Sequence, residues 1–329
     1  MNDRLKVFTW HIHGSYLYYL SKGNFDIYIP LDESRGAGYI GRGSFPFGSN
    51  VHEVPAHEVR QMDFDCIVFQ SPKNYLVDQH VLFSPAQHAT PKIYLEHDPP
   101  QQSPTNTVHT VDDPDMTLVH VTHFNRLMWN NNHTPAHVIE HGVIDHGIAY
   151  TGELEKGIVV INNLATRGRR LGHDILQEVR KHVPIDIVGM NSKEVGGLGE
   201  VPLAELPEFT APYRFFFNPI RYTSLGLSLL EAMMIGMPVV GLATTELPSV
   251  IQHGVSGFLY NDIDQVVKSM KLLLHDPELA FQVGKEAKLV ASTRFNIARF
   301  TQDWEALFQH AIKKKHPYRS FQQLHRNVN

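Results

Sequence analysis

The sequence predicts an α/β protein built from two doubly wound units, each with a parallel sheet between helices. Short, continuous apolar runs rich in β-branched and aromatic residues recur along the chain. Such runs are typical of strands that are covered on both faces. In the second half they alternate with helical patterns, which favours parallel strands joined by crossover helices. A length of 329 residues is enough for two domains with separate cores.

Six runs in the first half are predicted strands, and the helices between them are predicted to be short. The Gly-, Ser- and Pro-rich stretch from Asp32 to Pro55 is predicted to form one long loop. The predicted strands are KVFTW (6–10), FDIYIP (25–30), CIVFQS (66–71), KIYLEH (92–97), TLVHVT (117–122) and HVIEHG (137–142), and the helices include YLYYLSKG (16–23) and HFNRLMWNN (123–131).

A polar, glycine-rich break at AYTGELEKG (149–157) is predicted to be a hinge, after which the strand and helix pattern restarts. Strands are predicted at IVVINN, IDIVGMN, YRFFFN and PVVGLA, with helices at GHDILQEVRKH and LSLLEAMMIG. A final helix presents one apolar stripe that includes Phe300 and Trp304. We therefore predict an N-terminal domain (1–150), a C-terminal domain (151–296), and a last helix with a basic tail (297–329).

The overall composition excludes several classes of protein. Lysine and arginine number 29 against 34 acidic residues, a net charge of -5, so we expect no nucleic-acid partner. One cysteine, no signal-peptide pattern and no apolar run of membrane-spanning length predict a cytoplasmic protein. Any membrane association is expected to be peripheral at most.

The stretch RYTSLGLSLLEAMMIGMPVVG (221–241) places one carboxylate, Glu231, within an apolar helical run. Gly226 and Leu227 stand where a loop becomes this helix, and a helix N-terminus offers N–H groups to an anion such as a diphosphate. Glu231 lies about one turn further along, where a carboxylate can accept two hydrogen bonds from a ribose diol. The alternative is a glutamate that only complements the helix dipole.

A second motif, NLATRGRRLGHDIL (163–176), follows the first strand of the second domain. Arg167, Arg169 and Arg170 cluster there immediately before a helix. Guanidinium groups suit bidentate contact with phosphate, and the helix start adds N–H donors. A solvated basic loop is the alternative.

These motifs resemble the donor-binding signature of retaining glycosyltransferases of family 4. The residues in register are Pro219, Arg221, Gly226, Glu231, Ala232, Met233, Gly236, Pro238, Val239 and Val240. The resemblance is strong over about 138–308 and weak before that. It implies a GT-B fold, with two Rossmann-like doubly wound domains that face a central cleft.

The resemblance also implies roles for single residues. Glu231 corresponds to the acid that holds the nucleotide ribose, and the arginines correspond to a basic pair in the family's loop. His97 matches a histidine near the donor sugar and the reacting centre, although a strand-end capping cluster is its plain interpretation. Gly14 stands in the family's glycine-rich loop, which approaches the donor phosphates. The family's first glutamate, eight residues before the second, is Thr223 here.

His11 and His13, together with His123 and Asn125, are predicted on the acceptor side. His-x-His after a first strand is also how metal-dependent amidohydrolases open, which gives a rival hypothesis of a hydrolase with a barrel fold.

The leading hypothesis is a glycosyltransferase that moves a sugar from a nucleotide-diphosphate donor to a saccharide, lipid-linked or other hydroxyl acceptor. By resemblance, it retains the anomeric configuration and needs no metal or other cofactor. A non-catalytic nucleotide-sugar binder, favoured by Thr223, is the alternative.

Overall fold

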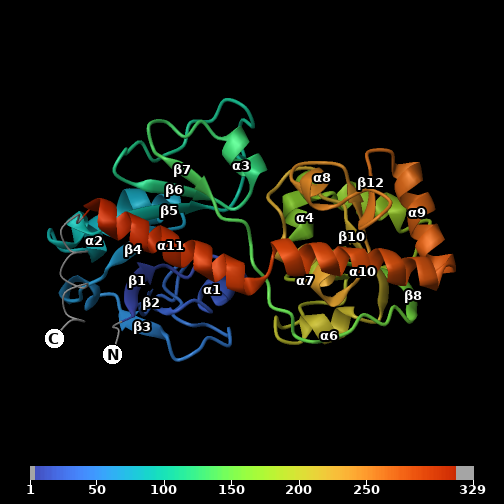
Figure 1. The fold of residues 1–329 in the computed structure, drawn as a ribbon, viewed down its shortest axis with the longest axis horizontal. Coiled ribbons are helices and arrows are strands. Elements are labelled where there is room, and N and C mark those ends of the chain that lie inside the picture. The colour runs from blue at the N-terminus through green and yellow to red at the C-terminus, as the bar shows by residue number, and fades with distance from the viewer. Residues whose placement is uncertain (1–3, 316–329) are drawn as a thin grey trace, which may run out of the picture. The chain divides into compact units, whose positions relative to one another are not determined.

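The computed structural model describes residues 4–315, which form two compact units (Figure 1). Unit 1 is the part of Met1–His141 and Ile297–Asn329 that is described, and unit 2 is Gly142–Asn296. Each unit has its own parallel sheet with helices on its faces, which confirms the predicted fold class. The predicted basic tail beyond Lys315 lies outside the described residues.

Unit 1 contains a seven-stranded sheet of order β3-β2-β1-β4-β5-β6-β7 in which every neighbouring pair is parallel. The chain winds outward from β1 in one direction and then crosses back to β4 on the other side. The point where the winding reverses therefore lies between β1 and β4. The strands are β1 (Leu5–Thr9), β2 (Phe25–Leu31), β3 (Val51–Pro55), β4 (Cys66–Phe69), β5 (Lys92–Glu96), β6 (Thr117–His120) and β7 (Ala136–Val138).

The helices of unit 1 are short except for the last, which packs back onto this unit. In that helix, α11, the buried Trp304 donates its indole N–H to the Tyr16 hydroxyl at 2.9 Å, and Phe308 packs edge-on against Phe25. None of the helices in the described chain is apolar over enough of its length to cross a bilayer. The helices are α1 (Gly14–Leu20), η1 (Val59–Gln61), η2 (Asn74–Asp78), α2 (Gln79–Leu82), η3 (Gln87–Ala89), α3 (His123–Met128) and α11 (Ile297–Lys315).

The predicted loop from Asp32 to Pro55 is wrong at its end, because residues 51–55 form the edge strand β3. Val51 pairs in parallel register with Ile27, and both Val51 and Val54 are buried. An edge strand needs only a few buried side chains and tolerates Pro55 at its end, so its short pattern was hidden among turn residues.

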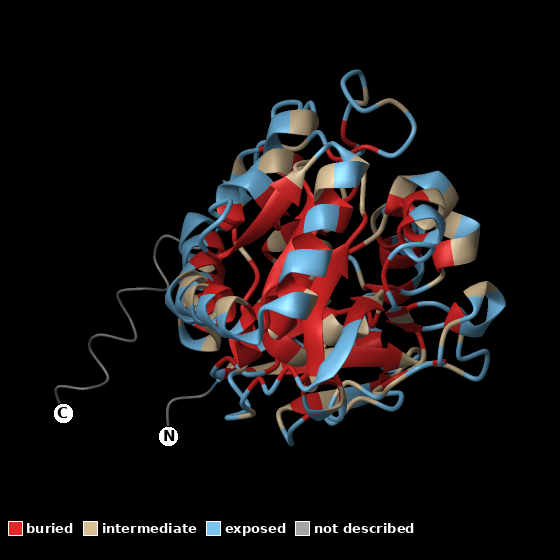
Figure 2. Ribbon diagram, turned by 90° about the vertical axis from the view of Figure 1, so that its right-hand side faces the viewer, coloured by how far each residue is buried: buried red, intermediate tan, exposed pale blue. Residues whose placement is uncertain are grey.

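Unit 2 contains a five-stranded parallel sheet of order β12-β11-β10-β8-β9. Its winding reverses between the central strands β8 and β10. All six residues of β10 are buried, and Figure 2 shows the buried strands in red between helices whose outer faces are exposed. The strands are β8 (Leu154–Val160), β9 (Ile185–Val188), β10 (Tyr213–Asn218), β11 (Val239–Leu242) and β12 (Gly257–Tyr260).

The predicted hinge at residues 149–157 is not a separate linker in this fold. β8 begins at Leu154, and its first three residues are exposed, which explains their polar character. Tyr150 is tied into unit 2 through its N–H to Ile235 O and its hydroxyl to Arg214 O. The helices of unit 2 are α4 (Leu164–Arg167), η4 (Gly168–Leu171), α5 (His173–Val179), η5 (Ser192–Val195), α6 (Leu206–Thr210), α7 (Leu227–Ile235), α8 (Leu247–Val250), α9 (Ile263–His275) and α10 (Pro277–Arg294).

Gly172 joins the arginine-bearing loop to the start of α5 and is packed against the end of β10. Its φ is +79°, and a Cβ added there would lie 1.9 Å from the Pro219 carbonyl oxygen. The left-handed conformation disfavours other residues, and this backbone contact leaves no room for a side chain. Gly168, in the same loop, has a φ of +52° but nothing within 4 Å of an added Cβ.

We expect Gly172→Ala to destabilise the protein more than Gly254→Ala, a control whose φ of +77° is similar and whose added Cβ would meet nothing within 4 Å. The control carries only the conformational cost of about 1 kcal/mol, whereas overpacking brings Gly172→Ala to roughly 3 kcal/mol. Thermal unfolding of both variants measures the difference. Equal losses in Tm would contradict the close packing of Gly172 on Pro219.

Candidate functional site

The loops that leave the carboxyl ends of β8 and β10 carry the predicted donor-binding residues. Ligands of open parallel sheets bind at these ends, where the winding reverses. The loop after β8 holds Arg167, Arg169 and Arg170, and the loop after β10 runs from Pro219 to Gly226. The Ser228 hydroxyl, in the first turn of α7, donates to Val160 O at 3.1 Å and ties the start of α7 to the end of β8.

Asp174, in the first turn of α5, links these loops through its carboxylate. Arg221 reaches it with two nitrogens, Nη1 at 2.5 Å and Nη2 at 2.9 Å, and Arg169 forms an ion pair with it from the other loop. The hydrogen bond from Arg221 lowers the pKa of Asp174. Arg221 also donates to the carbonyl of Arg169 at 2.7 Å, and its own N–H bonds to Arg170 O. The arginine loop is therefore held in a defined conformation.

The three predicted arginines have different surroundings. Arg169 is committed to Asp174 and is largely exposed, with 76% of its side chain accessible. Arg167 is half-buried at the end of α4. Arg170 is half-buried, and its guanidinium makes no ion pair or hydrogen bond with any of residues 4–315. Of the three, Arg170 is the cation whose donors are available to an anion.

Glu231 lies in the second turn of α7, at the border between packed surface and solvent. Its neighbours Leu230 and Ala232 are buried, whereas Glu231 itself is half-buried. The helix begins after Gly226, its N-cap residue, which is extended and provides no side-chain cap. Gly226 and Leu227 are half-buried, and Thr223 is buried in the preceding loop. A half-buried carboxylate near a helix start suits a ligand that carries both a diol and an anion.

In unit 1 the carboxyl ends of β1, β4 and β5 bring a second polar cluster together. His97, directly after β5, forms a hydrogen bond from its Nε2 to Gln70 Oε1 at 3.1 Å. The His13 ring lies 3.8 Å from the His97 ring between centroids, and Tyr16 meets His97 edge-on at 4.8 Å. Burial, helped by His13 and His141, holds the pKa of His97 well below its usual range. His97 is therefore neutral at pH 7.

His11 and Gly14 lie against the loop that covers the end of β1. His11 Nδ1 is 2.6 Å from the Gly41 carbonyl oxygen, so this nitrogen carries the proton and donates. Its ring packs edge-on against Phe45 and Phe47, and burial lowers the pKa of His11. A Cβ on Gly14 would lie 2.2 Å from the Phe45 ring. The structure thus gives His11 a role as an anchor for this loop and separates it from His13.

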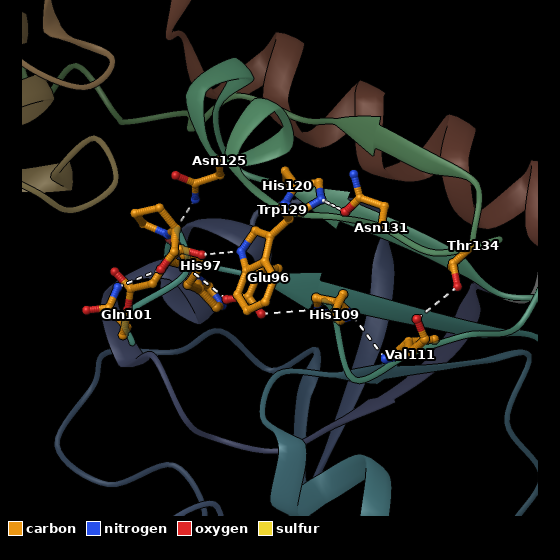
Figure 3. A network of polar contacts seen from close by, with 12 residues as sticks. Glu96, His97, Gln101, His109, Val111, His120, Asn125, Trp129, Asn131 and Thr134 are labelled. Atoms are coloured by element: carbon orange, nitrogen blue, oxygen red, sulfur yellow. Dashed lines mark hydrogen bonds and ion pairs between the residues drawn. The ribbon is translucent and has the colours of Figure 1, made fainter. Parts of the chain in front are cut away.

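A network of polar contacts fixes the turn that follows β5 (Figure 3). The Val111 N–H donates to His109 Nδ1 at 3.0 Å, so His109 Nε2 carries the proton that faces Glu96 at 3.2 Å. The other oxygen of Glu96 accepts from the Asp98 N–H, and the Trp129 indole donates to Asp98 O at 2.8 Å. The network therefore holds the backbone on both sides of His97.

Asn125 and His123 belong to α3 but have different environments. Asn125 is fully buried, and its amide donates to the His97 carbonyl at 3.1 Å, as Figure 3 shows. The Thr122 hydroxyl caps the helix by accepting from the Asn125 N–H. His123 is exposed at the start of the helix. The structure thus joins Asn125 to the His97 cluster and leaves His123 on the surface.

The rival hypothesis of a barrel hydrolase is wrong, because the chain forms two separate open sheets. His11 and His13, which would have to act as paired ligands, contact different groups. Across residues 4–315, no three His, Cys, Asp or Glu side chains gather as a metal site would require.

Residues 165–276 match the family model described as glycosyl transferases group 1. This segment includes the arginine loop, Asp174, Gly226 and Glu231. This segment is therefore similar to the group 1 glycosyl transferases, which confirms the resemblance that the sequence motifs indicated.

Two proteins to which part of the chain is similar are also named as glycosyltransferases. Sulfoquinovosyl transferase SQD2 of Arabidopsis thaliana is 38% identical over 89 residues, and O-antigen chain mannosyltransferase B of Escherichia coli is 40% identical over 81 residues. These matches cover 26% and 24% of this chain but only 18% and 21% of the relatives, about a fifth of their length. The solved structure of Anabaena Alr3699/HepE in complex with UDP-glucose has a TM-score of 0.63 at 13% identity, and covers 93% of this chain and 100% of that one. That likeness shows a shared fold.

Sequence reasoning missed Asp174 and Gln70 as site residues. Asp174 follows the arginine loop by four residues, and Gln70 is the first residue after the strand Cys66–Phe69. The available signals were a polar residue at the carboxyl end of a predicted parallel strand for Gln70, and an acid in the first turn of the helix after the arginine loop for Asp174.

Lowering the pH from 7 to 4 is expected to destabilise unit 1. Burial lowers the pKa of His120 from 6.5 to about 4. Between these values the unfolded chain binds a proton that the native protein does not, so stability falls as the pH falls. The loss from this residue is about 3 kcal/mol.

His120→Gln is the variant that tests this, because glutamine can still donate to Asn131 Oδ1, the partner of His120 Nε2 at 2.8 Å. Urea unfolding at pH 7 and pH 4.5 should show a smaller acid-induced loss in the variant. An unchanged loss would mean that His120 is not held neutral.

Proposed function

We propose that the protein is a glycosyltransferase that transfers a sugar from a nucleotide-diphosphate donor to an acceptor hydroxyl. The observation that carries this proposal is that the arginine loop and the segment that leads to Glu231 directly follow β8 and β10, the two strands between which the winding of the unit 2 sheet reverses. The same segment matches the group 1 glycosyl transferases. The relatives named as sulfoquinovosyl and mannosyl transferases, and a similar fold in complex with UDP-glucose, support a nucleotide-sugar donor.

In this proposal unit 2 binds the nucleotide end of the donor. Glu231 accepts hydrogen bonds from the ribose hydroxyls, which uses its half-buried carboxylate. Arg170 and Arg167 contact the diphosphate, while Arg169 remains bound to Asp174 and keeps the loop in place. The N–H groups at Gly226 and Leu227 add positive potential at the start of α7.

The bond between the anomeric carbon and the diphosphate oxygen breaks, and the acceptor oxygen bonds to that carbon as the hydroxyl loses its proton. Negative charge grows on the leaving diphosphate, so fixed cations act on the transition state more than on the bound donor. We propose that protein cations and the helix dipole supply this charge, without a metal, and that the product retains the anomeric configuration, as the resemblance implies.

Unit 1 is proposed to bind the sugar and the acceptor, a saccharide, lipid-linked or other hydroxyl compound. The neutral His97 is the candidate catalytic residue, because it can exchange hydrogen bonds with hydroxyl groups at pH 7. His13 lies beside it and belongs to the same proposed site, and Asn125 holds its backbone. His11 and His123 are less well placed to contact the acceptor, because His11 is bonded to Gly41 O and His123 is exposed outside this cluster.

A second candidate function is a nucleotide-sugar binder without transferase activity. Thr223 favours it, because a buried threonine stands where the family's first glutamate is expected. A hydroxyl cannot replace the charge of a carboxylate near the sugar. This candidate predicts binding of a nucleotide diphosphate and no turnover with any acceptor.

We expect Glu231→Gln to weaken nucleotide-sugar binding at least about tenfold, because the charged acceptor of the ribose diol is lost. Isothermal titration with UDP, GDP and their glucose conjugates measures the effect. Glu178→Gln is the matched control, an exposed glutamate on α5 paired with Lys181, and it should bind as wild type does. Unchanged affinity in Glu231→Gln would refute the ribose role.

The two arginines that follow Gly168 should differ in their effects. Arg170→Ala is expected to raise the Kd for a nucleoside diphosphate about tenfold through loss of a charge-assisted contact. Arg169→Ala should change it less than about threefold, since Arg221 still holds Asp174. Titration of both variants with UDP and GDP decides the assignment, and the reverse order of effects would overturn it.

A further inference from the structure

Gln70 occupies the point where the winding of the unit 1 sheet reverses. It is the first residue after β4, between the carboxyl ends of β1 and β5. Only 6% of Gln70 is exposed, and its side chain forms hydrogen bonds with Thr9 and Trp10 at the end of β1 and with His97 at the end of β5. A buried amide needs hydrogen-bond partners for its nitrogen and its oxygen, so the partners of Gln70 show which way its amide faces.

The hydrogen bonds of Gln70 determine which way its amide faces. The Trp10 carbonyl oxygen can only accept, and it lies 2.8 Å from Gln70 Nε2. The Thr9 hydroxyl, also 2.8 Å from Nε2, donates its own proton to Val68 O at 2.9 Å and therefore accepts from Gln70. Both protons of the amide nitrogen are thus used on β1 and the residue that follows it, and Oε1 is the atom that faces His97.

This orientation fixes the tautomer of His97. Gln70 Oε1 is an acceptor, so His97 Nε2, 3.1 Å away, must carry the proton and donate it. Because His97 is neutral, its Nδ1 then has a free lone pair. Within residues 4–315 no hydrogen bond to Nδ1 is formed, although the His13 and Tyr16 rings lie beside the imidazole.

We propose that Gln70 is a positioning residue that holds His97 in the Nε2–H tautomer and so makes Nδ1 the atom that accepts a hydrogen bond from a substrate hydroxyl. The tautomer follows from the geometry of unit 1 alone, whereas its use in sugar transfer rests on the proposed function. Asn125 completes the arrangement by holding the His97 carbonyl at 3.1 Å, so both the ring and the backbone of His97 are fixed.

The test compares Gln70→Leu with Gln87→Leu in the full chain. Gln87 is an equally buried glutamine of unit 1 whose Nε2 donates to two backbone carbonyls, Val59 O and Met62 O, each at 2.7 Å. Both variants lose similar buried hydrogen bonds, but of the two glutamines only Gln70 is bonded to His97. Gln70→Glu is a second variant that keeps an acceptor for Nε2–H.

Long-range ¹H–¹⁵N spectra of the histidine side chains, with His97 assigned from the His97→Asn spectrum, report the tautomer without any ligand. Wild type, Gln87→Leu and Gln70→Glu should show His97 protonated at Nε2, and Gln70→Leu should show a mixture of tautomers. A wild-type His97 protonated at Nδ1, or a tautomer unchanged in Gln70→Leu, would overturn the proposal.

Turnover of the nucleotide sugar that the protein binds gives the second measurement. Gln70→Leu should lower kcat at least about tenfold with little change in donor KM, and Gln87→Leu should leave both nearly unchanged. Equal losses in the two variants would overturn the catalytic part of the proposal. If wild type binds no nucleotide sugar, the proposed function fails, and the spectra still decide whether Gln70 sets the tautomer.

Discussion

The carboxylate of Asp174 is the constraint on which the proposed donor site depends. It binds Arg221 and Arg169, which come from the loops after β10 and β8, and so joins the two loops that flank the reversal of the sheet. One carboxylate and two guanidinium groups thus form a single cluster of charges. Because Arg169 and Arg221 are used in this way, the loop presents Arg170 separately from its structural cations. The architecture thus separates charges that shape the site from charges that are available to a ligand.

In unit 1 the side chains at the point where the winding of the sheet reverses differ in chemistry from those in unit 2. Its polar groups at the ends of β1, β4 and β5 are mostly neutral, and burial keeps His97 in that state. A neutral imidazole held by Gln70 and Asn125 suits the recognition of hydroxyl groups, whereas guanidinium groups suit a diphosphate. Glu96, which is paired with His109, fixes the turn after β5. These side chains are the basis for proposing that unit 2 binds the diphosphate and unit 1 binds hydroxyl groups.

Sequence patterns predicted most of the fold because its strands are continuous apolar runs. Glu231 and the arginines could be proposed as site residues because glycines mark the loops beside them. The edge strand Val51–Pro55 could not, since its few buried residues stand among turn formers. The Arg221–Asp174 bond spans 47 residues, and the Gln70–Thr9 bond spans 61, so neither leaves a local pattern. Such contacts arise only when parallel strand ends are brought together, and a single sequence does not specify the orientation of a buried amide.

The central claim is that one nucleoside diphosphate bridges Glu231 and the arginine loop at the ends of β8 and β10. A crystal structure of the protein with UDP or GDP bound tests it most directly. The account predicts ribose hydroxyls within hydrogen-bond distance of Glu231 and phosphate oxygens beside Arg170 and the first turn of α7. A nucleotide bound at any other place on unit 2, with Glu231 facing only protein, would contradict it.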